Sequence, residues 1–188
     1  MIRPLLERRW LASGLKKNRT MKKLHSGVTL LELIITVAIV AILGAIAAPS
    51  FSTMFRNSRL GTDANDLLAD LALARSEAAK RGARVTICVS DSGTSCSGTN
   101  WASGRIVFVD QGTAGTVDPG DTILRVTSAL AGANTLSASS FANNNYIQYR
   151  PKGATDSTGT FTLCAGTTGR TITINTTGRA TLATHTCS

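Results

Sequence analysis

Residues 25–50 have the sequence HSGVTLLELIITVAIVAILGAIAAPS, and this stretch decides how the N-terminal part of the chain folds. Residues 33–48 carry no charged side chain. A helix over residues 28–48 would extend roughly 30 Å, which is the thickness of the hydrocarbon core of a bilayer. One carboxylate, Glu32, lies near the start of the apolar run. A lone acid in an apolar segment of membrane length is energetically costly, so we interpret Glu32 as a functional residue.

Most of the positive charge of the chain precedes this run. The formal net charge of the 188 residues is +9, but residues 1–27 contain eight of the 20 Lys and Arg residues and only one of the 11 Asp and Glu residues. Basic residues on one side of a membrane segment favour a cytoplasmic N-terminus, with the C-terminal part outside the cytoplasm. Residues 28–188 are nearly neutral, so the overall charge is not evidence for a nucleic-acid partner.

An ordinary secretory signal peptide is the alternative interpretation of the same stretch. It requires a cleavage site between small residues, for which AIA at 45–47 or APS at 48–50 would serve. The mature protein would then begin near Phe51, as expected for a secreted enzyme. Glu32 within the apolar region, and a helical pattern that continues beyond that region, argue against this alternative.

A second helical pattern follows, over residues 50–82. Its apolar residues recur at spacings of three and four, and polar residues occupy the opposite face. The apolar face consists of Phe51, Met54, Phe55, Ala64, Leu67, Leu68, Leu71, Ala74 and Ala78. The opposite face consists of Arg56, Arg59, Asp63, Asp66, Asp70, Arg75 and Lys80. We therefore predict one long helix over residues 28–81 that ends at Gly82 and buries its second half against a sheet.

Short β-type segments separated by Gly, Ser, Thr and Asn make up residues 83–188. The predicted strands are residues 84–90, 104–110, 122–128, 146–150, 160–165, 170–175 and 179–184. No segment of helix length separates them, so we expect antiparallel sheets. Residues 129–145 are predicted to form a long exposed loop. The predicted fold class is α+β, with a long N-terminal helix packed on antiparallel β-sheets.

Four cysteines, Cys88, Cys96, Cys164 and Cys187, all follow the apolar run. An even number on the extracytoplasmic side indicates two disulfides, and four cysteines allow three pairings. We favour Cys88–Cys96, which would close a short Gly/Ser loop, and Cys164–Cys187, which would tie the C-terminus to a neighbouring strand. A zinc site is the alternative, but the chain has no CxxC pattern and only His185 lies nearby.

The sequence contains no recognisable catalytic constellation. His25 precedes the apolar run and His185 lies near the end, with no Ser/His/Asp grouping, HExxH pattern or phosphate-binding Gly loop. A calcium site at Asp118 and Asp121 is conceivable, but the spacing lacks the order of an EF-hand. Solvated turn residues are the simpler interpretation, so we predict no enzymatic activity, no metal and no cofactor.

Four basic residues in the C-terminal third are candidate contacts to DNA: Arg150, Lys152, Arg170 and Arg179. Arg170 and Arg179 each follow a Gly, in the segments TTGRTITI and TTGRATLA. If their strands are neighbours, the two guanidinium groups could share one edge and bind phosphates. The alternative is solvated charge on an edge strand, which discourages aggregation.

Residues 27–32, GVTLLE, resemble the processing site of type IV prepilins. The resemblance implies that a prepilin peptidase cuts after Gly27 and methylates the amine of Val28, although Phe is usual at that position. Glu32 would then be the fifth residue of the mature chain, where its carboxylate could pair with the amine of Val28 or of an adjacent subunit. The alternative interpretation places Glu32 near the membrane interface, where water solvates it.

The length of the leader leaves two candidate start residues. Met21 begins MKKLHSG, a short basic leader that ends in Gly and has the usual form in this family. Residues 1–20 have no clear apolar period. Translation therefore starts either at Met1, with an unusually long leader, or at Met21.

The rest of the chain resembles one branch of this family, the minor pilins and pseudopilins called FimT, FimU and GspH. The matching segments are DANDLLADLALARSEAAKRGARVTICVS, NWASGRIVFVD and FTLCAGTTGRTITINTTGRATL. The resemblance implies a pilin-like fold with four parts. These are a leader at 1–27, a transmembrane or filament-core helix at 28–49, an amphipathic helix at 50–82 and a periplasmic antiparallel β domain at 83–188.

The resemblance implies a filament subunit that passes once through the inner membrane, with a cytoplasmic N-terminus and a periplasmic C-terminal domain. The first hypothesis is a minor pilin in the tip or priming complex of a type IV pilus. Its partners would be other pilins through the N-terminal helix, the prepilin peptidase and the inner membrane. One alternative is a GspH-type pseudopilin of a type II secretion system.

The other alternative is a DNA-binding minor pilin for natural transformation. DNA-binding FimT members carry a Gly-Arg-x-basic motif near the C-terminus. The corresponding segment here, GRAT at 178–181, lacks the second basic residue, which weakens this hypothesis.

Overall fold

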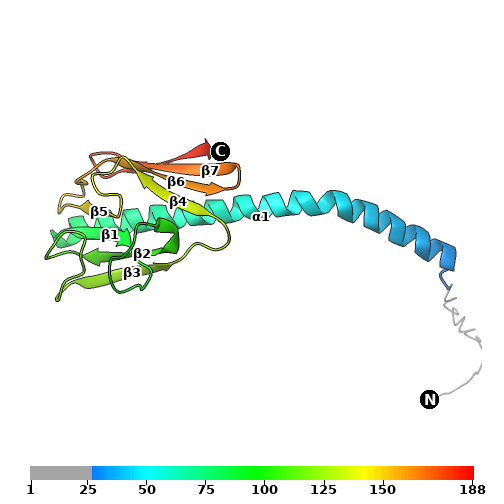
Figure 1. Ribbon diagram of the computed structural model, residues 1–188, viewed down its shortest axis with the longest axis horizontal. Helices are drawn as coiled ribbons and strands as arrows, with labels where there is room; N and C mark the ends of the chain where they lie inside the picture. Colours follow the sequence, from blue (N-terminus) through cyan, green and yellow to red (C-terminus); the bar gives the residue numbers. More distant parts are fainter. Residues whose placement is uncertain (1–26) are drawn as a thin grey trace, which may run out of the picture. The chain divides into compact units, whose positions relative to one another are not determined.

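The structure, a computed structural model, describes residues 27–188, except for the side chains of residues 48–50. Both candidate start residues, Met1 and Met21, lie outside the described residues. The chain divides into two compact units, one that ends at Gly44 and one that runs from Ala45 to Ser188. Helix α1, Leu30–Arg81, contributes to both units, and strands β1–β8 follow it (Figure 1).

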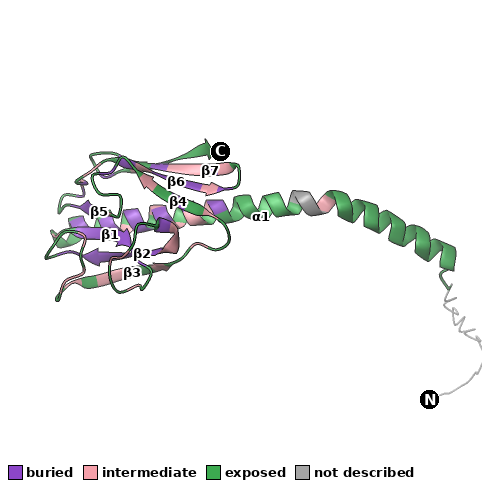
Figure 2. Ribbon diagram, viewed as in Figure 1, coloured by how far each residue is buried: buried purple, intermediate pink, exposed green. Residues whose placement is uncertain are grey.

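The described part of the first unit, residues 27–44, contains the beginning of α1. Thr29 caps this helix, because its hydroxyl accepts the backbone N–H of Glu32 at 3.2 Å and its carbonyl accepts that of Leu33 at 3.1 Å. These bonds satisfy donors that have no partner within the first helical turn. Figure 2 shows this part of the helix exposed to solvent. By length and composition, α1 is apolar enough to cross a membrane.

Two four-stranded antiparallel sheets make up most of the second unit. The first has the order β3-β2-β1-β5 and consists of Thr122–Ser128, Gly104–Val109, Val85–Val89 and Tyr146–Tyr149. The second has the order β4-β6-β7-β8 and consists of Thr135–Ser139, Gly159–Ala165, Thr168–Ile174 and Ala180–Thr186. A short 3-10 helix, η1 (Trp101–Ser103), leads into β2. The predicted α+β class is confirmed.

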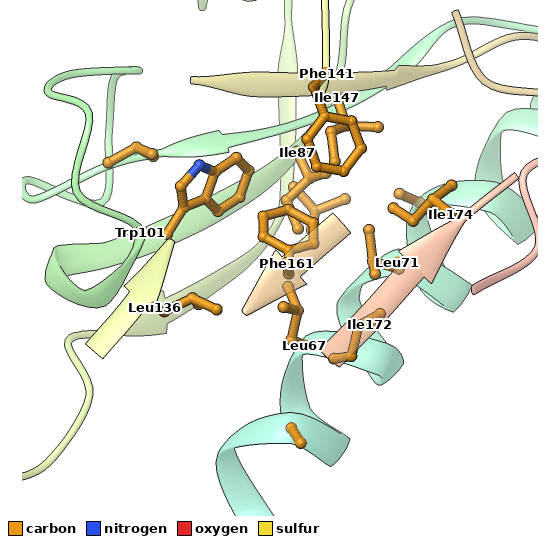
Figure 3. Packing of buried hydrophobic residues seen from close by; sticks show 14 of the residues in the cluster. Leu67, Leu71, Ile87, Trp101, Leu136, Phe141, Ile147, Phe161, Ile172 and Ile174 are labelled. Carbon is orange, nitrogen blue, oxygen red and sulfur yellow. The ribbon is translucent and has the colours of Figure 1, made fainter. Parts of the chain in front are cut away.

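The core of the second unit lies between α1 and the two sheets (Figures 1 and 3). Helix α1 contributes Leu60, Ala64, Leu67, Leu71, Ala74 and Ala78, all of them buried. The same hydrophobic cluster includes Ile87 from the first sheet and Phe161 and Ile172 from the second. The ring of Trp101 meets that of Phe161 edge-on, with the centroids 4.7 Å apart. The predicted burial of the amphipathic helix against a sheet is therefore correct from Leu60 onward.

Part of the predicted apolar face of α1 is not buried. Phe51, Met54 and Phe55 are 58%, 68% and 65% exposed, whereas Leu60 is fully buried. The prediction was wrong for these three residues because the spacing of apolar positions does not show how far the sheets extend along a helix. Their exposed apolar side chains can contact lipid or another protein.

Residues 129–145 are not the uninterrupted loop that we predicted, because β4 lies within them. Leu136 is buried and Ala138 packs against the core, while the alternate Thr135, Ser137 and Ser139 are exposed. Strand β4 pairs with β6 along its whole length. Its small Ser, Thr and Ala side chains give a weak β-strand pattern, and pairing with β6 determines its conformation.

Asp70, which we assigned to the polar face of the helix, is completely buried instead. It lies three residues after Leu67 and four before Ala74, so helix geometry places it on the buried face. Its Oδ2 accepts a hydrogen bond from Nε of Arg105 at 2.6 Å, and its Oδ1 lies 2.8 Å from Nε of Arg125. A carboxylate from α1 is thus paired with guanidinium groups from β2 and β3.

Candidate assembly surface

The predicted processing site immediately precedes helix α1. Gly27 and Val28 are exposed and belong to no helix or strand. Val28 is 67% exposed, and a Cβ added at Gly27 would meet no atom within 4 Å. The Gly27–Val28 bond therefore lies in exposed backbone outside the regular helix.

Glu32 lies in the first turn of α1 and is exposed. Thr29 and Glu32 have the Thr-x-x-Glu order of a capping box, and the Thr29 hydroxyl accepts a hydrogen bond from the backbone N–H of Glu32. A carboxylate near a helix N-terminus is also favoured by the helix dipole, by about 0.3–1 kcal/mol. Among residues 27–188, no cation forms a salt bridge with Glu32. Its carboxylate is thus free to bind a cation from elsewhere.

The first turns of α1 expose a continuous set of apolar side chains. In the first unit, this apolar helix surface consists of Val28, Leu30, Leu31, Leu33, Ile34, Ile35, Val37, Ile39, Val40, Ile42 and Leu43. Each of these residues is at least half exposed. Exposed apolar surfaces of this size mark contacts with lipid or with other proteins. The apolar helix surface is therefore a candidate site for assembly.

Two disulfides hold the second unit together. Cys88–Cys96 joins the end of β1 to the following loop, with the Cα atoms 5.6 Å apart. Cys164–Cys187 joins β6 to the residue after β8, with a Cα separation of 6.1 Å. This is the pairing that we favoured from the sequence. The cysteines are therefore structural, and their sulfur atoms are not available to a metal.

The structure brings together some of the basic candidates for DNA binding and separates others. Arg150 and Lys152 lie in the turn after β5, which also contains Gly153. This turn lies directly against the turn that carries Arg179, because a Cβ added at Gly178 would lie only 2.2 Å from the Gly153 carbonyl oxygen. Arg150, however, forms an ion pair with Asp156.

Arg170 is not part of this group. It pairs with Thr184 in the register of β7 and β8, whereas Ile174 pairs with Ala180, the neighbour of Arg179. Four residues of extended strand, about 13 Å, therefore separate the two arginine positions along the hairpin. The prediction that Arg170 and Arg179 share one edge was wrong, because they lie at opposite ends of neighbouring strands.

The two aspartates considered for calcium stabilise a turn instead. Asp118 Oδ2 accepts the N–H of Thr113 at 2.6 Å, and Asp121 accepts the N–H groups of Gln111 and Asp118 at 3.0 and 2.9 Å. Within residues 27–188 there is no group of three or more His, Cys, Asp or Glu side chains arranged to hold a metal ion.

Sequence inspection missed Arg75 and Tyr149, which adjoin the basic turns. Nε of Arg75 donates to the carbonyl of Gly153 at 3.1 Å, and Tyr149 is completely buried. The helical pattern placed Arg75 on the polar face of the helix but did not indicate a functional role. The strand that contains Tyr149 was predicted, but nothing in its sequence singled out the tyrosine. Their proximity is a product of the tertiary fold.

Two family models match the chain. The model of type II transport protein GspH matches residues 63–178, more than half of the chain, and the model of the prokaryotic N-terminal methylation motif matches residues 22–48. No curated protein matches significantly.

Two crystal structures of the type IV minor pilin FimU from Pseudomonas aeruginosa have a similar fold, with TM-scores of 0.55 and 0.52 and 22% sequence identity in each case. The alignments cover 68% and 66% of this chain and 90% and 92% of the FimU chains.

Proposed function

We propose that this chain, which belongs to the family of type II transport protein GspH and has a fold similar to that of the type IV minor pilin FimU, is a minor subunit of a type IV pilus. A prepilin peptidase cuts it after Gly27 in the inner membrane, and the mature subunit enters the tip or priming complex of the filament. Before assembly its N-terminus is cytoplasmic and its β domain is periplasmic. Its partners are the peptidase and the N-terminal helices of other pilins, and it has no catalytic role.

One observation carries this proposal: an accessible Gly27–Val28 bond is followed by Glu32 in the first turn of a helix with an exposed apolar surface. Cleavage would create a positively charged amine at Val28, next to a carboxylate in apolar surroundings. Pairing of Glu32 with the amine of an adjacent subunit neutralises both charges. Because the carboxylate and the amine must be in contact to form the pair, the pair also fixes the axial position of one helix against the next.

The experiment that tests this proposal is the mass of the mature N-terminal peptide, measured from the membrane fraction of cells that express the full chain. We expect a peptide that begins with N-methylated Val28. A mature N-terminus near Phe51 would instead indicate a secreted protein with a cleaved signal peptide. An uncut chain that begins at Met1 or Met21 would indicate a simple membrane anchor.

A pseudopilin of a type II secretion system is the second candidate, and the match to the model of a type II transport protein favours it. Deletion of the gene distinguishes the two functions. A pilus subunit predicts fewer surface filaments in the sheared fraction and normal export of folded enzymes. A pseudopilin predicts a normal number of surface filaments and reduced export of folded enzymes.

A further inference from the structure

A pocket of about 270 Å³ opens on the second unit between α1 and the turn that joins β7 to β8. Its lining includes Arg75, Arg179 and Tyr149, together with the apolar side chains of Leu68 and Leu71. We refer to it as the Arg75–Arg179 pocket. Its residues come from α1, β5 and the β7–β8 turn, so only the folded chain brings them together.

Neither guanidinium group of the pocket is neutralised by the chain itself. Arg75 uses its Nε to bind the carbonyl of Gly153, which holds the side chain against the turn after β5. Throughout the described range, 27–188, no salt bridge involves Arg75 or Arg179. Because two like charges at one pocket repel each other, an anion between them would lower the electrostatic energy.

Tyr149 of β5 lines the same pocket and is placed to report on its occupancy. Its side chain is completely buried, and its hydroxyl has no hydrogen-bond partner among the described residues. Burial raises the pKa of this hydroxyl above its usual value, although the Arg75 guanidinium opposes the rise. The hydroxyl has no accessible surface, so a ligand in the pocket does not reach it, but the tyrosine ring lines the pocket and senses a charge bound there.

The lining matches a carboxylate on a short aliphatic stem. Arginine binds carboxylate oxygens through charge-assisted, bidentate hydrogen bonds. Leu68 and Leu71 provide apolar contacts for the methylene groups of an Asp or Glu side chain.

A DNA strand is a poorer match for the same surface. DNA presents a row of phosphates, and proteins that follow it need several free cations. Here Arg150 is already paired with Asp156, and residues 28–188 are nearly neutral. The pocket instead offers one enclosed position for one anionic group.

We propose that the Arg75–Arg179 pocket binds the carboxylate of a Glu or Asp side chain from a neighbouring filament subunit. The inference rests on the proposed function for the identity of the neighbour. The two guanidinium groups bind the carboxylate oxygens. This contact lies on the second unit and does not involve the exposed apolar helix surface of residues 28–43.

Tyr149 also makes the proposal directly measurable. The chain has only two tyrosines, so full-length protein in detergent micelles, labelled with ¹³C at tyrosine Cζ, gives two assignable signals. The hydroxyl of Tyr146 accepts a hydrogen bond from Asn143 outside the pocket and serves as the internal control. The probes are N-acetyl-glutamate N-methylamide, its neutral glutamine counterpart, inorganic phosphate and a short DNA duplex.

We expect the glutamate probe to shift the Tyr149 signal in a saturable way and to leave the Tyr146 signal unchanged. The glutamine counterpart should cause no shift. A stronger response to phosphate or to the duplex than to glutamate would overturn the assignment to an acidic side chain, and so would the absence of any response.

Two substitutions of exposed basic residues sharpen this test. Arg179→Ala should weaken binding of the glutamate probe at least about tenfold, because it removes one charge-assisted partner. Lys152→Ala removes the same charge from the adjoining turn but not from the pocket. It should change the affinity by less than about twofold, since exposed charges outside the site are screened by salt. Equal losses in both variants would point to a diffuse cationic surface and overturn the proposal.

A cellular experiment separates this inference from the proposed function. Arg179→Glu should lower the amount of the subunit in sheared filaments while the Lys152→Glu control stays at the wild-type level. If wild-type protein enters filaments and Arg179→Glu enters equally well, the proposed function stands and the pocket contact is refuted. If wild-type protein enters no filament, the proposed function fails, even when the purified chain binds the glutamate probe.

Discussion

Helix α1 contains one region that is exposed and one region that the rest of the chain buries. From Leu30 to Leu43 it is apolar around most of its circumference and exposed, whereas from Leu60 to Ala78 its apolar residues form one buried stripe. A stripe can be covered by sheets of the same chain, but a helix that is apolar all round needs lipid or other helices on every side. The pattern within one helix therefore separates what the chain buries by itself from what it leaves to its surroundings.

The largest effect should come from breaking the polar contact of the buried region. Asp70→Ala leaves Arg105 buried with its carboxylate partner removed, so we expect the free energy of unfolding to fall by about 3–5 kcal/mol. Urea denaturation of the full chain, followed by the fluorescence of buried Trp101, measures this loss. Asp66→Ala, on the same helix but only half-buried, should cost less than about 1 kcal/mol. Equal losses would contradict the special role of Asp70.

The comparison itself is tested by one truncation in each region. Leu71→Ala should lower the free energy of unfolding by about 2–5 kcal/mol, because it leaves a cavity between the helix and the sheets. Ile39→Ala should change it by less than about 0.5 kcal/mol, because the side chain is exposed. For recovery in sheared filaments, we expect Ile39→Ala to reduce the yield without any loss of stability. If Ile39→Ala destabilised the chain as much as Leu71→Ala does, the two regions would not differ as described.

The disulfides belong entirely to the unit that covers its own core, so their removal should affect stability. The Cys164–Cys187 bond spans 23 positions and the Cys88–Cys96 bond spans 8. In the chain-entropy model, replacing each pair by serine should cost about 3.4 kcal/mol for the longer loop and about 2.5 kcal/mol for the shorter one. Denaturation of both double variants, with and without reductant, measures these costs. A variant that keeps wild-type stability would show that its bond is dispensable.

A small effect on stability, with a large effect on assembly, should come from Glu32→Gln. The loss of a carboxylate in the first turn costs about 0.3–1 kcal/mol of helix stability. We expect incorporation into filaments to fall about tenfold, because an amide cannot neutralise the Val28 amine of a neighbouring subunit. Glu77→Gln, the same substitution at a half-buried position near the C-terminal end of α1, is the matched control. Unchanged incorporation of Glu32→Gln would refute the pairing role.

The sequence was sufficient wherever one local pattern decided the structure. The spacing of Leu67, Leu71 and Ala74 correctly predicted a buried helical face, and alternation in TITI at 171–174 correctly predicted a strand of an antiparallel sheet. Strand β4 was missed because its conformation comes from pairing with β6 and not from its own residues. The environment of Asp70 was missed because a charge on a helix was assumed to face solvent.

Features that depend on which turns meet could not be predicted. Arg75 and Arg179 are 104 positions apart in the chain and line one pocket, whereas Arg170 lies only nine positions from Arg179 and is separate from it. The register of β7 and β8 separates Arg170 from Arg179, and the packing of the β7–β8 turn beside α1 brings Arg179 to Arg75. Sequence inspection can identify such basic residues as candidates, but only the fold determines which of them act together.

The buried Asp70 contact also has a mechanical consequence. Leucine and alanine side chains make contacts without preferred direction, so they define the axial position of a helix less sharply than directional polar contacts do. Asp70 forms ion pairs with Arg105 of β2 and Arg125 of β3, and a slide of one helical turn, about 5.4 Å, would break both of them. These ion pairs therefore hold the helix at one axial position relative to the first sheet. A tensile force that reaches this part of α1 is transmitted to the first sheet without slippage.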